Sequence, residues 1–268
     1  MIIDFHTHSF PDSLAPRAMA SLIPTFTAIA SFSPQTDGTA SGAKKLLSEA
    51  GVSRAVVCNI ATNARQEPKV NDYAISLLND GFFCPLGSVH PDSENIESEL
   101  DRLKAAGIKG IKLHPDYVRI TLDDDRYDKI FAQLIKRDMF VVVHAGRDPI
   151  SPDKIHATPE MFRAVIEKYP SLKIIAAHMG GFAKAEDVYR HLVGTGVFID
   201  TSLSSLRDSE KEVLYKILSD HDENKILFGT DTPWSIPTRE IEFIKNAPVS
   251  EEKKEKIFYK NALSLLGI

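Results

Sequence analysis

Eight short apolar segments constrain the fold of this chain more strongly than any other feature of its sequence. In chain order they read MIIDF, RAVVCNI, FFCPLGSV, IKGIKL, MFVVVHA, LKIIAAH, GVFID and KILFGTD. Segments that are apolar on both faces, and that recur every roughly 25–35 residues with helical patterns between them, are typical of parallel strands covered by helices. Eight such units predict a single-domain TIM barrel, an α/β (βα)8 fold, over residues 1–268.

Helix signals fill most of the intervals between these segments. One apolar stripe at helical spacing consists of Tyr127, Ile130, Phe131, Leu134 and Ile135. Thr158 followed by Pro159 predicts the start of another helix, and Ser93 predicts the start of a third helix that ends at Gly107. An open doubly wound sheet is the alternative to the barrel, but no GxGxxG or GxxxxGKS/T loop follows the first segment.

The composition argues against several classes of partner. The chain has 268 residues, of which 43% are hydrophobic and 26% charged, as in an ordinary globular protein. Its net charge of −5 offers no basic stripe for nucleic acid. The apolar segments are far shorter than the ~20 residues that cross a bilayer, and no signal-peptide pattern is present, so we expect no membrane partner and a cytoplasmic location. Cys58 and Cys84 lie in apolar segments and are expected to be reduced core thiols.

Residues 9–42 interrupt the regular alternation. They are rich in Ser, Pro, Thr and Ala and carry no firm helix signal. We expect a long loop between the first strand and the first helix that serves as a lid, with a partly ordered surface excursion as the alternative.

Histidine and aspartate side chains collect at the carboxyl ends of the predicted strands. The histidines are His6, His8, His114, His144 and His178, and the aspartates are Asp200 and Asp231. One such histidine is often a hydrogen-bonded core residue, and one such aspartate is often a helix cap. Together, at the end of a TIM barrel that carries the active site, they predict a catalytic centre.

The HTH motif suggests what kind of centre this is. Residues i and i+2 of a strand point to the same face and lie roughly 6–7 Å apart, so His6 and His8 can converge on one cation. A zinc-type ion takes nitrogen or oxygen ligands at ~2.0–2.2 Å, and His144 and Asp231 are placed to complete the set across the barrel mouth.

Seven motifs in this order resemble the amidohydrolase superfamily, and within it the amidohydrolase-related group that includes aminocarboxymuconate-semialdehyde decarboxylase. They are DFHTH, GIKLHP, VVVHAG, KIIAAHMGG, VFIDTS, ILFGTDTPW and KIFYKNALSLLGI, and they span essentially the whole chain, with residues 9–42 least matched. The resemblance implies that His6, His8, His144 and Asp231 hold one divalent ion, expected to be Zn²⁺. It also implies that His178 is a catalytic residue beside the ion, where His178 or Asp231 moves the proton of an activated water.

Two related families share the opening HxH but fit less well. TatD-like nucleases place a glutamate near the end of the fourth strand, where this chain has Lys112 and His114. PHP phosphoesterases close with a DxH motif, where this chain has GTD.

The remaining candidate residues line the expected pocket. Lys112 and His114 share one face of their strand, and Lys112 is either an ammonium that contacts substrate or a carbamylated bridge between two metals. Arg147 is placed either to hold a substrate carboxylate or to form a salt bridge on its loop. Trp234 is either a pocket wall or a packing residue.

Three function classes remain open on the sequence. The leading one is a metal-dependent hydrolase of a C–N or C–O bond in a small carboxylated molecule. The second is a non-oxidative decarboxylase or hydratase that uses the same residues, because fold and metal do not fix the reaction class. The third is a metal-binding barrel without activity. A small-molecule substrate is the expected partner, and a homodimer is left open.

Overall fold

Eight short parallel strands form the wall of the barrel in the computed structural model, which describes residues 1–30 and 33–268. The strands are β1 (Ile3–Thr7), β2 (Arg54–Cys58), β3 (Phe83–Leu86), β4 (Gly110–Leu113), β5 (Phe140–Val143), β6 (Ile174–Ala176), β7 (Phe198–Asp200) and β8 (Ile226–Leu227). Each strand pairs with its neighbours in chain order, as β1-β2-β3 and as β4-β5-β6-β7-β8.

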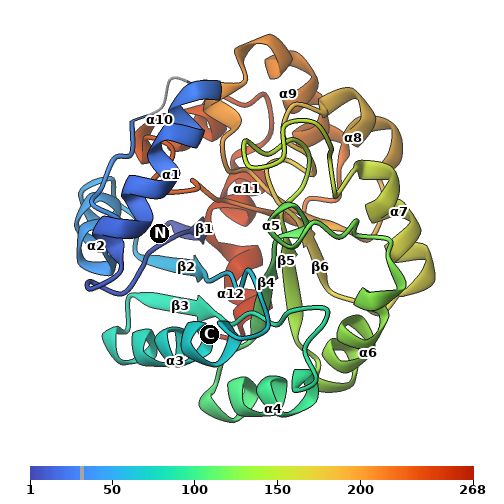
Figure 1. Cartoon of the computed structure of the whole chain (residues 1–268). Helices are drawn as coiled ribbons and strands as arrows, with labels where there is room; N and C mark the ends of the chain where they lie inside the picture. Colours follow the sequence, from blue (N-terminus) through green and yellow to red (C-terminus); the bar gives the residue numbers. More distant parts are fainter. Residues whose placement is uncertain (31–32) are drawn as a thin grey trace.

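Backbone contacts join these two sheets into a closed barrel. Between β3 and β4, the amide of Lys112 donates to the carbonyl of Gly87 at 2.8 Å. Between β8 and β1, the amide of Phe5 donates to the carbonyl of Phe228 at 2.7 Å. The predicted (βα)8 TIM barrel is thereby confirmed, with the helices arranged around the strands (Figure 1).

Most of the helices surround the strands, whereas α5, α11 and α12 lie near the centre of the view (Figure 1). The helices are α1 (Ala15–Ala30), α2 (Ala40–Glu49), α3 (Glu67–Leu77), α4 (Ile96–Ala106), α5 (Pro115–Val118), α6 (Asp128–Arg137), α7 (Pro159–Lys168), α8 (Ala185–His191), α9 (Lys211–Asp220), α10 (Pro237–Lys245), α11 (Glu251–Glu255) and α12 (Asn261–Leu266). Among the described residues, no helix is both long enough and apolar enough to cross a membrane.

Helix starts and ends follow the sequence signals in part. Thr158 caps α7 by accepting from the amide of Met161, as predicted, and Gly107 ends α4 in a left-handed conformation. The predicted cap Ser93 is wrong by two residues, because α4 begins after Asn95. The Ser93 hydroxyl instead donates to the buried carboxylate of Glu67 at 2.9 Å.

The segment 9–42 is not a loop throughout, because α1 runs from Ala15 to Ala30 within it. The sequence signal was weak because α1 has no acidic residue in its first turn, no basic residue in its last turn, and Pro24 inside it. Residues 31–32 of the expected lid lie outside the described residues. On the inner side, Met19 of α1 packs with Leu203 and Trp234 in a small apolar cluster.

The barrel interior is apolar at its lower end, where the strands begin, and polar at its upper end, where the carboxyl ends of the strands lie. Inward-facing side chains such as Phe5, Phe140 and Val142 form one buried cluster with Ala262 and Leu266 of α12. The C-terminal helix therefore closes the lower end of the barrel, and the carboxyl ends of the strands stay open for a site.

Candidate metal centre

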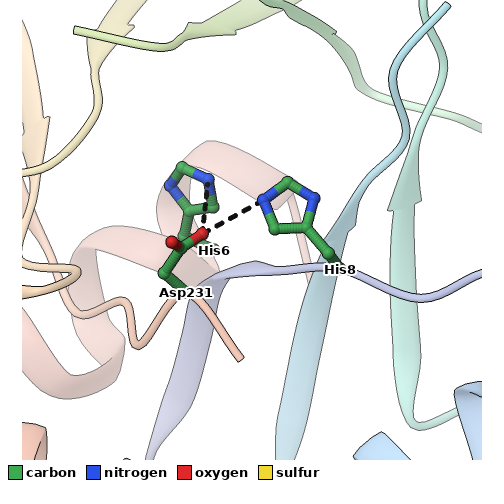
Figure 2. A group of neighbouring side chains, drawn as sticks. All are labelled: His6, His8 and Asp231. Atoms are coloured by element: carbon green, nitrogen blue, oxygen red, sulfur yellow. Dashed lines mark ion pairs between the residues drawn. The ribbon is translucent and has the colours of Figure 1, made fainter. Parts of the chain in front are cut away.

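The structure brings together three of the four predicted metal ligands. Nε2 of His8 lies 3.1 Å from Oδ1 of Asp231, and Nε2 of His6 lies 3.5 Å from the same oxygen (Figure 2). Two ligands that each bind one ion at about 2.1 Å in tetrahedral geometry lie about 3.4 Å apart. These three atoms therefore have the spacing that a zinc-type ion requires.

A β-bulge in β1 points His6 into the barrel. Asp4 pairs with Ala55 and Thr7 pairs with Val57, so three steps along β1 match two steps along β2. The extra residue changes which side chains face inward. Phe5 lies in the inner apolar cluster, and His6, the next residue, reaches the cavity above it.

Hydrogen bonds to the far nitrogens fix both imidazole rings. Nδ1 of His6 lies 2.8 Å from Oδ2 of Asp200, and Nδ1 of His8 lies 2.9 Å from the carbonyl oxygen of Cys58. Both acceptors require a proton on Nδ1, which leaves the lone pair of each Nε2 directed at Asp231. Such contacts orient metal-binding histidines in general.

Burial favours the neutral form of the His6 and His144 imidazoles. It is the main cause that lowers the pKa of His6 well below its usual value, and the nearby Lys112 lowers it further. Burial, followed by His114, lowers the pKa of His144 to about 3. Burial raises the pKa of Asp231, against the opposing effect of its hydrogen bond with His8. Neutral imidazoles have free lone pairs, which is the form that binds a cation.

Lys112 lies directly beside this group. Its side chain is fully buried, and Nζ is 3.0 Å from Nε2 of His6, to which it donates. The sequence placed Lys112 in the pocket, but it did not predict this contact. An ammonium and a metal ion would compete for the same lone pair.

His178 is held beside His6 by an unusual turn. The two rings are stacked, with their centroids 4.9 Å apart. His178, Met179 and Gly180 all have positive φ, at 56°, 58° and 81°. The guanidinium of Arg207 is buried and donates to the carbonyls of His178 and Gly181 at 3.0 and 3.1 Å, which fixes this turn.

A chain of hydrogen bonds sets the proton positions of His178. Its Nδ1 lies 2.7 Å from Oγ of Ser202, and the Ser202 hydroxyl donates to Oδ1 of Asp200. Ser202 therefore accepts from Nδ1–H, and Nε2 of His178 carries the lone pair. Because the other oxygen of Asp200 bonds to His6, one buried carboxylate orients both rings.

His144, the fourth predicted ligand, lies one ring further away. Its Nδ1 is 3.1 Å from Nε2 of His178, and its ring stacks on His114 with centroids 4.2 Å apart. Its Nε2 makes no hydrogen bond among the described residues and lies 3.6 Å from Oδ2 of Asp148. The same oxygen lies 3.5 Å from Nε2 of His114. His144, His114 and Asp148 thus form a second donor group at the edge of the first.

All of the predicted site residues line one cavity of about 810 Å³. Its floor contains His6, His8, Asp231, Lys112 and His178. Its other predicted members are His114, His144, Arg147 and Trp234. The Trp234 ring stacks on Phe26 of α1 at a centroid distance of 4.0 Å, so Trp234 is both a wall of the cavity and a packing residue.

Sequence reasoning missed the roles of Asp200, Ser202 and Asp148. Asp200 was noticed at the end of its strand, but its bond to His6 joins residues 194 positions apart in the chain. Its place at the same barrel end as the histidines was the available signal. Ser202 lies in the VFIDTS motif and Asp148 follows Arg147, but neither position indicates a contact with a histidine.

A TIM barrel with two converging histidines at the end of its first strand, and an aspartate in the segment that follows its last strand, defines a class of metal-dependent barrel enzymes. The amidohydrolase family model matches residues 3–268, and the chain belongs to this family. A search of curated protein sequences finds no match.

Solved structures confirm the fold. An uncharacterized TIM-barrel protein from Bordetella bronchiseptica is 17% identical with a TM-score of 0.76, covering 100% of this chain and 99% of its own. A 5-carboxyvanillate decarboxylase from Novosphingobium aromaticivorans, complexed with manganese and 4-hydroxy-3-methoxy-5-nitrobenzoic acid, is 17% identical with a TM-score of 0.75, covering 100% and 96%. A dihydroxybenzoic acid decarboxylase from Polaromonas, with manganese and 2-nitroresorcinol, is 17% identical with a TM-score of 0.70, covering 99% and 96%.

Proposed function

We propose that this chain is a metal-dependent, non-oxidative decarboxylase of a small aromatic or unsaturated carboxylic acid. The observation that carries the proposal is a buried floor of cation-binding groups and one buried lysine under a mainly apolar cavity. Lys112 and the three-ligand group of His6, His8 and Asp231 form the floor, and aromatic residues such as Phe182 and Trp234 form the walls. The structures of similar fold that are named decarboxylases support this reading over the hydrolase that the sequence favoured.

The floor and the walls act on different parts of such a substrate. The Lys112 ammonium attracts the carboxylate of the substrate to the floor. Flat rings in the walls, such as that of Trp234, leave room for the planar body of the substrate. A divalent ion held by the floor would supply Lewis acidity toward substrate oxygens. The apolar walls exclude water. Loss of hydration destabilises the concentrated charge of the carboxylate more than the dispersed charge that forms as CO₂ leaves.

The reaction balances with one proton. The bond between the carboxylate carbon and the substrate carbon breaks, and its electron pair stays on the substrate carbon. That carbon takes up a proton, so that R–COO⁻ and H⁺ give R–H and CO₂. Asp231 and His178 are the two groups that line the floor and are placed to hold and move this proton.

Hydrolysis of a lactone or amide is the second candidate. It is favoured by the lone pair on Nε2 of His178, which the Ser202 and Asp200 contacts leave unprotonated and which accepts a proton from water once its hydrogen bond with Nδ1 of His144 is exchanged for one with water. In either reaction we propose one divalent ion per chain, with His144 as the fourth ligand and with Zn²⁺ and Mn²⁺ as the ions to compare.

The decisive experiment measures two products separately. Protein reconstituted with Zn²⁺ or Mn²⁺ is incubated with 2,6-dihydroxybenzoate and related hydroxybenzoates, and CO₂ release is recorded. The same preparations are given carboxylated lactones and amides, and acid release is recorded. We expect CO₂ from the wild type and none from Asp231→Asn. Acid release without CO₂ would replace the decarboxylase with the hydrolase.

A further inference from the structure

The second donor group lies beside the candidate metal centre, and the proposed reaction leaves two of its members, His114 and Asp148, without a role. Nε2 of His114 lies 3.5 Å from Oδ2 of Asp148, and Nε2 of His144 lies 3.6 Å from the same oxygen. Two ligands that bind one ion at about 2.1 Å in tetrahedral geometry lie about 3.4 Å apart. The second donor group therefore has the spacing that a zinc-type ion requires, as the first group does.

Two neighbouring strands and a glycine turn build this group. His114 directly follows β4, His144 directly follows β5, and the amide of His144 donates to the last carbonyl of β4 at 3.1 Å. The two rings are stacked, with their planes only 11° apart. The chain then turns at Gly146, which has a φ of 89°, and reaches Asp148. A Cβ at Gly146 would lie 2.2 Å from the backbone nitrogen of Phe182, so this turn requires glycine.

Hydrogen bonds within the site leave a lone pair on Nε2 of His144. Nε2 of His178 carries a lone pair, because its Nδ1 donates to Ser202. Nδ1 of His144 lies 3.1 Å from that Nε2 and therefore donates to it. In the neutral imidazole, a proton on Nδ1 leaves a lone pair on Nε2.

This lone pair faces two carboxylate oxygens. Nε2 of His144 lies 3.6 Å from Oδ2 of Asp148 and 4.0 Å from Oδ2 of Asp116. Nε2 of His144 and Oδ2 of Asp116 are both buried, and neither has a hydrogen-bond partner within the described part of the chain. The other oxygens are engaged, because Oδ1 of Asp148 accepts from the amide of Ile150 and Oδ1 of Asp116 lies 3.0 Å from Nδ1 of His156. Buried acceptors that converge in this way require a cation or a hydrogen-bond donor between them.

The cavity gives an ion access to the second donor group. His114, His144 and Asp148 all line the cavity, although each is more than nine-tenths buried. Imidazole nitrogens and carboxylate oxygens are the donors that a zinc-type ion takes, and burial strengthens their attraction to a cation. Lys112, the residue considered as a carbamylated bridge, is not a member of this group.

We propose that His114, His144 and Asp148 form a second divalent-ion site, which fills when Zn²⁺ is in excess of one equivalent. Because Nε2 of His144 has a single lone pair, it binds one ion at a time. An ion at the second site therefore withdraws His144 from the first ion, so excess metal inhibits the reaction. The binding site stands on geometry, whereas this inhibition rests on the proposed function.

Metal titration tests the site without reference to turnover. The chain is freed of metal by a chelator and titrated with Zn²⁺ in a calorimeter, and then with Co²⁺, whose visible absorption reports the ligands around each ion. We expect two binding events, of which the second is the weaker because it takes a ligand from the first ion. In a parallel assay, turnover should fall as Zn²⁺ fills the second site.

Two substitutions remove the second site by different means. Asp148→Asn keeps the oxygen that accepts from Ile150 and removes the negative charge, and His114→Phe keeps a stacked ring and removes the nitrogen. Each should weaken the second binding event by about 10-fold or more and keep the first. Asp231→Asn should weaken the first event instead. Asp153→Asn is the matched control, because Asp153 is exposed on the same loop and is not among the described residues that line the cavity. Melting temperatures confirm that every variant is folded.

The outcomes separate the second site from the proposed reaction. A single equivalent of Zn²⁺ bound by the wild type, even in excess metal, would overturn the second site. A second event that survives in both Asp148→Asn and His114→Phe would overturn it as well, because the ion would then lie elsewhere. Two events without turnover of any acid, lactone or amide would support the second site while rejecting the proposed function. Turnover with a single binding event would do the reverse.

Discussion

Nδ1 of His144 lies 3.1 Å from Nε2 of His178, although the two rings follow different strands. Because Nδ1 of His144 bonds to His178, its Nε2, which has no hydrogen-bond partner among the described residues, is the nitrogen that can bind a metal ion. If His144 is the fourth ligand, an ion bound by Nε2 leaves the contact with His178 in place. The assignment of the two histidines can therefore be tested by removing each ring in turn.

His144→Ala and His178→Ala are expected to differ in metal content. Loss of His144 deletes one of four metal bonds, so metal content and turnover fall together. Loss of His178 leaves most of the metal in place and lowers turnover by roughly 10²–10⁴, the usual scale for a lost general acid or base. Elemental analysis and turnover on the same preparations decide it. A metal-free His178→Ala protein would make His178 the ligand.

Asp200→Asn and Ser202→Ala separate the two functions of the buried carboxylate. Asp200 bonds to His6 directly and to His178 through Ser202. Asp200→Asn should weaken metal binding about 10–100-fold, because the His6 ring loses its fixed tautomer. Ser202→Ala should keep metal affinity near that of the wild type and lower turnover. Metal titration by calorimetry distinguishes them, and equal losses of affinity in both variants would contradict this division.

Lys112→Met is expected to strengthen metal binding. The ammonium lies 3.0 Å from Nε2 of His6, and removing a like charge at that distance should raise affinity by about 10-fold or more. Lys109→Met, an exposed change at the other end of the same strand, is the control. We expect about one equivalent of metal in the wild type. Two equivalents that Lys112→Met abolishes would instead indicate a carbamylated lysine bridge.

Arg207→Met is expected to loosen the turn that carries His178. It leaves the carbonyls of His178 and Gly181 without their donor, at a cost of about 2–4 kcal/mol in the free energy of unfolding. Turnover should fall while metal is retained, and Arg207→Lys should restore part of both. Arg190→Met on α8 serves as the exposed control. Unchanged turnover in a destabilised Arg207→Met protein would limit Arg207 to a purely structural role.

Glu240 is expected to make stability depend on pH. Burial raises its pKa from 4.5 to about 8, so the folded protein holds a proton that the unfolded chain has lost. Its contribution is complete below the unfolded value and is lost as the pH rises through about 8. Glu240→Gln should gain about 2 kcal/mol on the wild type between about pH 6 and pH 8. Denaturant unfolding measures this, with exposed Glu242→Gln as the control. A difference in the free energy of unfolding between Glu240→Gln and the wild type that does not vary with pH would contradict a raised pKa for Glu240.

Periodic and local signals explain how much of this structure could be predicted. The eight apolar segments define the strands, and a parallel barrel brings the ends of those strands together, which is why His6, His8 and Asp231 meet. Both the strand periodicity and the HxH spacing are local, so they can be read directly.

Features that depend on distant partners could not be predicted. Lys112 contacts His6 across 106 positions, and Asp200 orients rings from two other strands. The helix α1 was missed because its stability comes from packing on Leu203 and Trp234 and not from its own caps. The bulge in β1 was missed because a register shift leaves no mark in the alternation of so short a strand.

That bulge divides one five-residue strand between two tasks. Below it, Ile3 and Phe5 pack with α12 and with the other inner side chains, so changes there should alter the melting temperature first. Above it, His6 faces the cavity, so changes there should alter the chemistry first. Deleting Phe5 is expected to turn the His6 imidazole away from Asp231 while leaving the rest of the sequence intact. This strand therefore tolerates substitution far better than it tolerates a change of length.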